Sequence, residues 1–259
     1  MFRSYVAIGD SFTEGLGDEL PDGRLRGWAD LVALGLALQL EASGGGPFRY
    51  ANLAIRGRKL APILAEQLEP ALEMKPELLS LNGGGNDIMR PKVAIADVAR
   101  TLEDAVGTAV DAGAHVLFIS GGDPSAHIPL GSLLRRRGEQ LARAVRAGQP
   151  RDSVTFVDNW ADEGLGDIRY WSADKLHLNA LGHARVAGNV LTALDAPVPP
   201  EWGVDEVAAA PPGVRSRNTS AYYREFVLPW IGRRLTGRSS GDGRAAKIPT
   251  LEPVDPSAA

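Results

Sequence analysis

The stretch that decides the fold is Tyr5-Val6-Ala7-Ile8-Gly9-Asp10-Ser11, in which a short apolar run stops at a glycine, an aspartate and a serine. An apolar run of this length, bounded by turn-forming residues, is typical of a buried β-strand. A helical pattern follows within a few residues. The sequence therefore predicts a strand that ends directly before an exposed serine hydroxyl.

Four more runs of the same kind follow, and longer helical patterns separate them. The predicted strands are residues 4–9, 48–53, 77–82, 115–120 and 153–158, and the predicted helices are residues 28–40, 60–73, 93–112, 130–146 and 180–194. Alternation of this kind requires crossovers and a parallel sheet covered on both faces. We therefore predict a three-layer α/β/α fold with five parallel strands in a doubly wound, flavodoxin-like sheet. Ligand chemistry then belongs in the loops at the carboxyl ends of the strands.

Composition excludes several classes of protein. The 259 residues are 44% hydrophobic and 23% charged, which is ordinary for a globular domain and argues against wholesale disorder. The absence of cysteine excludes disulfide scaffolds, thiolate metal sites and a cysteine nucleophile. With only four histidines, a histidine-rich metal centre is not expected, and the net charge of −4 argues against general nucleic-acid binding.

The apolar segments also bear on location. None reaches the roughly 18 residues that cross a bilayer, and the first predicted strand starts too early to leave room for a secretion signal. We therefore expect a cytoplasmic protein with no transmembrane segment. The sequence gives no indication of the oligomeric state.

The composition shifts near residue 195 and divides the chain into three parts. We expect a catalytic domain over residues 1–195, a linker rich in proline and alanine over residues 196–213, and a basic aromatic tail over residues 214–259. Residues 222–234 of the tail have the pattern of a short amphipathic helix, bent at Pro229. Residues 239–259 read as extended or disordered.

Three strand ends carry residues suited to chemistry, and Ser11 is the first. A serine between a strand and a helix has an exposed hydroxyl, and the helix N-terminus supplies positive potential that favours a developing anion. The alternative is that Asp10 and Ser11 only cap the helix. We expect Asp10 to brace the turn rather than to react.

The second strand end is Asn82-Gly83-Gly84-Gly85-Asn86-Asp87. Its glycines allow the backbone to approach a ligand closely, and Asn86 can offer its amide as a donor. The alternatives are a simple glycine-rich turn and a phosphate-binding loop, although the spacing matches neither common nucleotide motif.

The third strand end holds Asp174 and His177, three residues apart. That spacing lets the carboxylate accept from Nδ1 of the imidazole and leaves Nε2 free as a base, which a serine nucleophile needs. The alternative is a surface ion pair. His183 faces elsewhere and reads as a packing or capping residue, and His127 reads as a surface-loop residue.

Two further groups of residues allow weaker expectations. Trp160, Tyr170 and Trp171 flank the last strand-to-helix loop, where they could wall a binding site or simply pack. The run Arg135-Arg136-Arg137 lies on a helical pattern opposite its apolar face, which favours a solvated surface.

Together these blocks resemble the SGNH (GDSL-type) hydrolase family. The four matching blocks are Gly9-Asp10-Ser11-Phe12, the segment from Asn52 to Gly57, Gly84-Gly85-Asn86-Asp87, and Asp174 with His177. Phe12 replaces the usual leucine, and Leu178 stands where the family usually has proline. The blocks span residues 9–177, so the tail lies outside the resemblance.

The resemblance assigns a role to each residue. It implies that Ser11 is the nucleophile, His177 the general base and later the general acid, and Asp174 the group that orients the imidazole. The oxyanion hole would consist of the backbone N–H groups of Ser11 and Gly57 and the side-chain amide of Asn86. No metal or organic cofactor is implied.

The predicted function is hydrolysis of carboxylic esters or thioesters through an acyl-Ser11 intermediate, with a small-molecule ester as substrate. The alternatives are an acyltransferase, for example for O-acetyl transfer, on the same three residues, and a non-catalytic flavodoxin-like binding module. The family acts on lipids, acetylated sugars and thioesters with one core, so fold and triad do not select the substrate.

Overall fold

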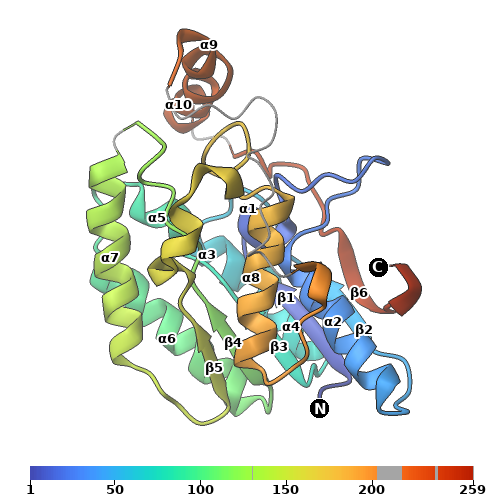
Figure 1. Ribbon diagram of the computed structural model, residues 1–259. Helices are drawn as coiled ribbons and strands as arrows, with labels where there is room; N and C mark the ends of the chain where they lie inside the picture. Colours follow the sequence, from blue (N-terminus) through green and yellow to red (C-terminus); the bar gives the residue numbers. More distant parts are fainter. Residues whose placement is uncertain (130, 203–217, 237–238, 259) are drawn as a thin grey trace.

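The computed structural model describes residues 1–129, 131–202, 218–236 and 239–258. Its centre is a six-stranded sheet in the order β5-β4-β3-β1-β2-β6 (Figure 1). The strands are β1 (Ser4–Ile8), β2 (Arg49–Asn52), β3 (Leu78–Leu81), β4 (His115–Ile119), β5 (Val154–Val157) and β6 (Ile248–Pro253). The first five are parallel to one another, as predicted.

Helices cover both faces of this sheet and make the expected three layers (Figure 1). The α-helices are α1 (Ser11–Glu14), α2 (Trp28–Ala42), α3 (Leu60–Ile63), α4 (Glu69–Glu73), α5 (Gly85–Ile88), α6 (Ile95–Asp111), α7 (Gly131–Ala147), α8 (Ala180–Ala193), α9 (Ser220–Tyr222) and α10 (Leu228–Leu235). One face of the sheet packs against α2 and α8, and the other against α3, α4, α6 and α7.

The core follows from strand alternation. In β1, Tyr5 and Ala7 belong to the cluster under α2 and α8, whereas Val6 and Ile8 belong to the cluster under α6 and α7. Successive side chains of a strand point to opposite faces, and here both faces are buried, so β1 is apolar from Tyr5 to Ile8 rather than alternating.

The strand order also places the functional loops. The chain passes from β1 to β2 on one side and then returns to β3 on the other side of β1, so the direction of strand addition reverses between β1 and β3. Ligands of open α/β sheets bind at such a switch point, beyond the carboxyl ends of the strands. Ser11 follows β1 and Asn86 follows β3, so both lie at this point.

The sixth strand differs from the prediction. β6 runs antiparallel to β2, with a register shift between Tyr50 and Asn52, whereas the sequence led us to expect five strands and an extended or disordered chain end. Pro249 and Pro253 obscure this strand in the sequence, because proline cannot donate to a sheet ladder and is confined to edge strands. At the edge they leave the outer side poor in donors, which discourages pairing with another chain.

The predicted tail helix is present, with one irregular turn. Residues Tyr223–Val227 form a π-helical turn between α9 and α10, directly before Pro229, which has no N–H to donate to the carbonyl four residues earlier. Most of the predicted linker lies outside the described residues. Its first part does not: Val198 and Trp202 pack against the core.

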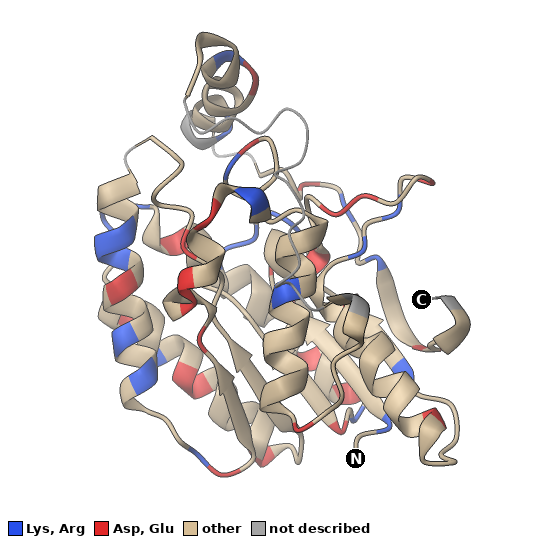
Figure 2. Ribbon diagram, in the orientation of Figure 1, with Lys and Arg blue, Asp and Glu red and all other residues tan. Residues whose placement is uncertain are grey.

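The arginine run on α7 behaves only partly as a solvated surface. Charged residues of both signs cover the outer side of α7 (Figure 2), and Arg135 pairs with Glu139 there. Arg137, however, donates to the carbonyls of Ile88, Arg90 and Val93 at 2.5–3.0 Å. It therefore anchors α7 to the loop after α5, a role that a periodicity pattern does not reveal.

Lys247 fastens the C-terminal segment to the domain. Its Nζ donates to the carbonyl of Glu14 at 2.7 Å, the carbonyl of Leu25 at 3.3 Å and Oδ2 of Asp30 at 2.6 Å. The side chains of Lys247 and Asp30 are only 17% and 20% exposed. Burial raises the pKa of Asp30 even though Lys247 lies against it.

We predict that Lys247→Met lowers the free energy of unfolding by about 3 kcal/mol, because it leaves a buried carboxylate and two carbonyls without their donor. The matched control is Arg100→Met, since Arg100 pairs with Asp97 where both side chains are largely exposed. That control should cost less than about 1 kcal/mol. Urea unfolding measures both, and equal losses would contradict the anchoring role of Lys247.

Candidate active site

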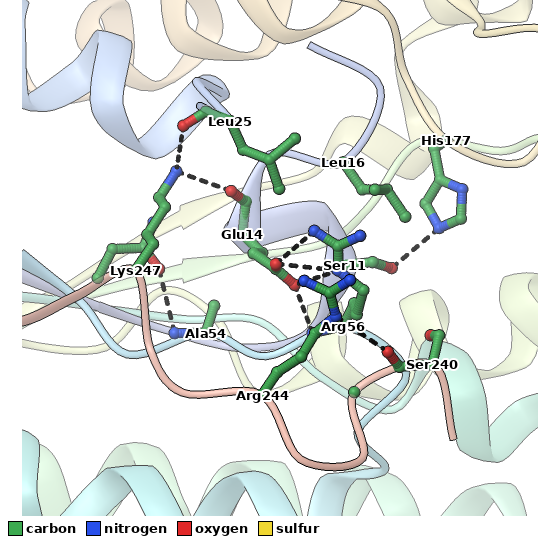
Figure 3. A network of polar contacts seen from close by, with 12 residues as sticks. Ser11, Glu14, Leu16, Leu25, Ala54, Arg56, His177, Ser240, Arg244 and Lys247 are labelled. Atoms are coloured by element: carbon green, nitrogen blue, oxygen red, sulfur yellow. Dashed lines mark hydrogen bonds and ion pairs between the residues drawn. The ribbon is translucent and has the colours of Figure 1, made fainter. Parts of the chain in front are cut away.

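Ser11 begins α1 immediately after β1. Asp10 caps this short helix by accepting from the N–H of Phe12 at 3.1 Å, and Gly15 ends it in the left-handed conformation. The Oγ of Ser11 lies 3.0 Å from Nε2 of His177 (Figure 3). Two residues 166 positions apart therefore form one hydrogen-bonded pair.

Asp174 completes a chain of three side chains. Its Oδ2 lies 2.5 Å from Nδ1 of His177, and its Oδ1 accepts from the N–H groups of Leu176 and His177 and from the hydroxyl of Ser172. These residues form a tight turn rather than a helix, with Lys175 at φ 61°. With Nδ1–H donating to Asp174, Nε2 is free to accept from the serine hydroxyl.

The contact between Asp174 and His177 lowers the pKa of the carboxyl group and raises that of the imidazole. Burial alone would raise the pKa of Asp174, but the neighbouring His177 and the N–H donors hold it well below its usual value. Burial alone would lower the pKa of His177, but the charge of Asp174 and its hydrogen bond raise it above the usual value. The carboxylate therefore stays ionised while the imidazole gains basicity.

A long loop brings His177 to Ser11. β5 lies at one edge of the sheet, opposite to β6. The chain that follows it must therefore cross β4 and β3 to reach β1. Its 3-10 turns are anchored along the way, for example by Asn159, which donates to the carbonyl of Ser120, and by Trp171, whose Nε1 donates to the carbonyl of Leu165. Asn179 then ties the loop down by donating to two of its carbonyls and caps α8.

Asn86 lies at the start of α5, where its amide has defined partners. Its Nδ2 donates to Oδ2 of Asp10 at 3.1 Å and to the carbonyl of Arg58 at 2.9 Å. Asp10 thus braces the turn and also holds Asn86. Burial raises the pKa of Asp10 to about 6, so at neutral pH its ionised form accepts from both neighbours.

Gly84 makes this loop possible. Its φ is 89°, and a Cβ there would lie 2.8 Å from Cγ1 of Val98. Asp87 in the same loop has a structural contact: its Oδ2 accepts from the N–H of Leu60 at the start of α3. The block therefore positions Asn86 without adding a second reactive group.

The segment from Asn52 to Gly57 carries the remaining predicted donor. Asn52 is fully buried and ties the end of β2 to the carbonyl of Thr13, next to the serine turn. Gly57 has φ 72°. Within the part of the chain that the structure describes, the backbone N–H groups of Ser11 and Gly57 have no hydrogen-bond acceptor, so both are available to a ligand.

An ion pair that the sequence did not reveal supports this segment. Arg56 binds Glu14 through its backbone N–H, Nε and Nη2 at 2.6–3.1 Å, and both side chains are nearly buried (Figure 3). The bidentate contact joins the end of α1 to the residue before Gly57. Neither residue belongs to a spacing motif, so only the three-dimensional contact identifies it.

The tail touches the site from two sides. Near Gly57, a Cβ would lie 2.5 Å from Oγ of Ser239 and 2.8 Å from Oγ of Ser240, and Ser240 lies beside Arg56 in Figure 3. On the other side, Tyr222 donates its hydroxyl to the carbonyl of Asp174 at 3.0 Å. Residues predicted to lie in a separate tail therefore contact two of the predicted site loops.

The other histidines have structural contacts. His183 is fully buried, its Nδ1 accepts from the N–H of Trp28 and its Nε2 donates to the carbonyl of Leu16, so it packs and caps α2. Burial lowers the pKa of His183 to about 4. His127 contacts the carbonyl of Gly166 and the ring of Trp171.

Among residues 1–129, 131–202, 218–236 and 239–258, no cluster of histidine and acidic side chains could hold a metal ion. No helix in the same ranges is long and apolar enough to cross a membrane.

Comparison with known proteins identifies the family of this chain. The sequence pattern of the GDSL-like Lipase/Acylhydrolase family matches residues 7–185. The chain belongs to this family. Its members hydrolyse ester bonds, so the protein is a hydrolase that acts on small-molecule esters. No curated protein matches the chain.

Several solved structures share the fold. TesA matches with 28% identity and a TM-score of 0.58 over 74% of this chain and 97% of that chain. The lipase Lip_vut3 from a goat rumen metagenome has 18% identity and a TM-score of 0.62 over 73% of this chain and 96% of that one. A catalytic variant of the acetylxylan esterase Axe2 from Geobacillus stearothermophilus has 20% identity and a TM-score of 0.60, over 80% and 97%. The last two show a shared fold only.

We predict that His177 and the buried His183 titrate in different pH ranges. In NMR titrations the His177 imidazole should titrate above about 6.5, its usual value, whereas His183 should stay neutral down to about pH 4. Asp174→Asn should lower the pKa of His177, because the attraction to the imidazolium is removed, and leave that of His183 unchanged. A wild-type His177 that titrates below 6.5 would be inconsistent with the contact to Asp174.

Proposed function

We propose that this family member is a serine esterase in which Ser11 attacks the ester carbonyl, His177 moves the proton and Asp174 orients the imidazole. One observation carries the proposal: Ser11 Oγ, His177 Nε2 and Nδ1, and Asp174 Oδ2 form an unbroken hydrogen-bonded chain with distances of 3.0 and 2.5 Å. A free hydroxyl is a poor nucleophile at neutral pH, and an adjacent oriented base activates it.

In the first step the Ser11 oxygen bonds to the carbonyl carbon while its proton passes to Nε2 of His177. The imidazolium that forms is stabilised by the ionised Asp174. When the tetrahedral intermediate collapses, the bond to the alcohol oxygen breaks, and His177 returns the proton to the departing alcohol. The acyl group remains on Ser11 as an ester.

The oxyanion of the intermediate would be bound by the N–H groups of Ser11 and Gly57 and by the amide of Asn86. The first two have no acceptor among the residues described, which suits this role. Both N–H bonds of the Asn86 amide already have acceptors, so donation to an oxyanion requires one hydrogen to be shared or redirected from Asp10 or Arg58.

In the second step we propose that water attacks the carbonyl carbon of the acyl-Ser11 ester while Nε2 of His177 takes a proton from it. When this second tetrahedral intermediate collapses, the bond between the acyl carbon and Ser11 Oγ breaks, His177 returns the proton to Ser11, and the carboxylic acid leaves. The half-exposed position of Ser11 and the 19% exposure of the His177 side chain support access of water.

An acyltransferase would use the same residues with an alcohol in place of water. Product analysis with added alcohol and sugar acceptors separates the two. Residence in the cytoplasm stays a prediction from the sequence.

We expect Ser11→Ala to lower kcat for short p-nitrophenyl esters by roughly 10⁴–10⁶-fold, because no other group replaces the attacking oxygen. The control is Ser43→Ala, whose hydroxyl contacts the end of α2 far from the site. It should retain wild-type turnover. Unchanged hydrolysis by Ser11→Ala would refute the assignment of the nucleophile.

For Asn86→Ala we predict a loss of about 10²–10³-fold in kcat with little change in KM, since an oxyanion donor acts mainly in the transition state. Steady-state kinetics on the same esters measure both constants. The opposite pattern, with KM raised and kcat unchanged, would assign Asn86 to substrate binding and exclude it from the oxyanion hole.

A further inference from the structure

A cavity of about 170 Å³ opens directly at the proposed catalytic residues. Its mouth is lined by Ser11, Asn86 and His177, and it continues away from them into the interior of the molecule. Protein cores are close-packed and rarely contain voids larger than a water molecule. A cavity of this size beside a nucleophile therefore calls for an occupant.

The cavity extends beneath α7. Five residues on the inner face of this helix line it, namely Leu134, Gly138, Leu141, Ala142 and Val145. At 1.5 Å of rise per residue, the segment from Leu134 to Val145 covers about 16 Å. The cavity therefore extends along most of this length between α7 and the sheet.

The opposite wall is apolar as well. Phe118 of β4 and Phe156 of β5 line it from the sheet, and Leu102 lines it from α6. The polar lining residues, such as Asn82 and Ser120, follow the strands at the mouth. Apolar cavities of this kind stay dry and bind hydrocarbon groups. The deep, apolar part of the cavity therefore suits an alkyl chain, and the polar groups at its mouth suit the carbonyl group of the ester.

Trp160 closes one side of the cavity. Its ring lies where a side chain at residue 138 would be, since a Cβ on Gly138 would come within 2.1 Å of the ring. Gly138 thus lets the indole pack directly against the backbone of α7. Two of the three aromatic residues near the last loop, Trp160 and Trp171, therefore line the cavity.

We propose that the cavity binds the acyl chain of the substrate, so that the protein prefers esters or thioesters of medium-chain fatty acids to acetyl esters. The proposal rests on the function proposed above. The acyl group stays on Ser11 until water releases it, and the apolar cavity beside Ser11 can hold its alkyl chain throughout. The alcohol must depart before water attacks, so it belongs on the open side of Ser11.

The test compares kcat/KM for p-nitrophenyl esters from acetyl through butyryl and octanoyl to dodecanoyl. We expect wild-type kcat/KM to rise by up to about fourfold per added methylene until the cavity is filled, in line with the transfer of a methylene from water to an apolar site. Octyl acetate, which places the alkyl chain on the alcohol, should gain no such advantage over ethyl acetate. A preference for octyl acetate over ethyl octanoate would overturn the assignment of the acyl side.

Ala142→Phe tests the position of the chain. Ala142 is buried and lines the cavity, so a phenyl ring should block its deeper part and lower kcat/KM for the octanoyl and dodecanoyl esters at least tenfold. The ratio of kcat/KM for the acetyl ester to that for the octanoyl ester should therefore rise at least tenfold, and an unchanged far-UV circular dichroism spectrum reports correct folding. Ala144→Phe is the matched control on the exposed side of α7 and should leave the whole profile unchanged. The smaller change Ala142→Leu should give an intermediate shift and substitutes if the phenyl variant does not fold.

Two outcomes separate failure of this proposal from failure of the proposed function. Decanoate should bind the Ser11→Ala variant, and addition of Ala142→Phe should abolish that binding in isothermal titration calorimetry. If Ser11 is essential but decanoate does not bind and acetyl esters are the best substrates, the cavity assignment is wrong and the esterase proposal stands. If Ser11→Ala retains turnover, the proposed function fails first.

Discussion

The hydrogen bond between Ser11 and His177 depends on the order of the strands. The two residues are 166 positions apart in the chain, one after the central strand β1 and the other after the edge strand β5. Parallel strands place all their carboxyl ends at one edge of the sheet, and the anchored loop after β5 crosses that edge to deliver the imidazole. The short contact to Nδ1 from Asp174 leaves Nε2 as the imidazole nitrogen that faces the serine hydroxyl.

Local patterns in the sequence predicted the parts of the molecule that depend on neighbouring residues. The strand that ends at Ser11, the glycine turn before Asn86 and the three-residue spacing of Asp174 and His177 are all features of short segments. In the structure these segments are joined by hydrogen bonds of Ser11 with His177, His177 with Asp174, and Asn86 with Asp10. Gly57 differs, because its place in the site was implied by resemblance to a family and not by any pattern around it.

The parts that the sequence did not predict are contacts between distant segments. β6 contains two prolines and lacks alternation, so it reads as irregular chain. Lys247, Arg137 and the pair of Glu14 with Arg56 look like ordinary charged residues until the acceptors around them are known. The same holds for the cavity under α7, whose lining residues have the apolar periodicity of any core helix. A void arises from how side chains of several elements fit together.

The C-terminal segment therefore belongs to the account of the site. It lies outside the family match, which ends at residue 185, yet Ser239 and Ser240 contact the loop of Gly57 and Tyr222 contacts the turn of Asp174.

The convergence of Ser11, His177, Gly57 and Asn86 is tested most directly by a crystal structure of the protein after inactivation with a p-nitrophenyl alkylphosphonate. The account predicts phosphorus bonded to Ser11 Oγ, with a phosphoryl oxygen within hydrogen-bonding distance of the Ser11 and Gly57 N–H groups and the Asn86 amide. A phosphorus atom on another residue, or a phosphoryl oxygen turned away from these donors, would contradict it.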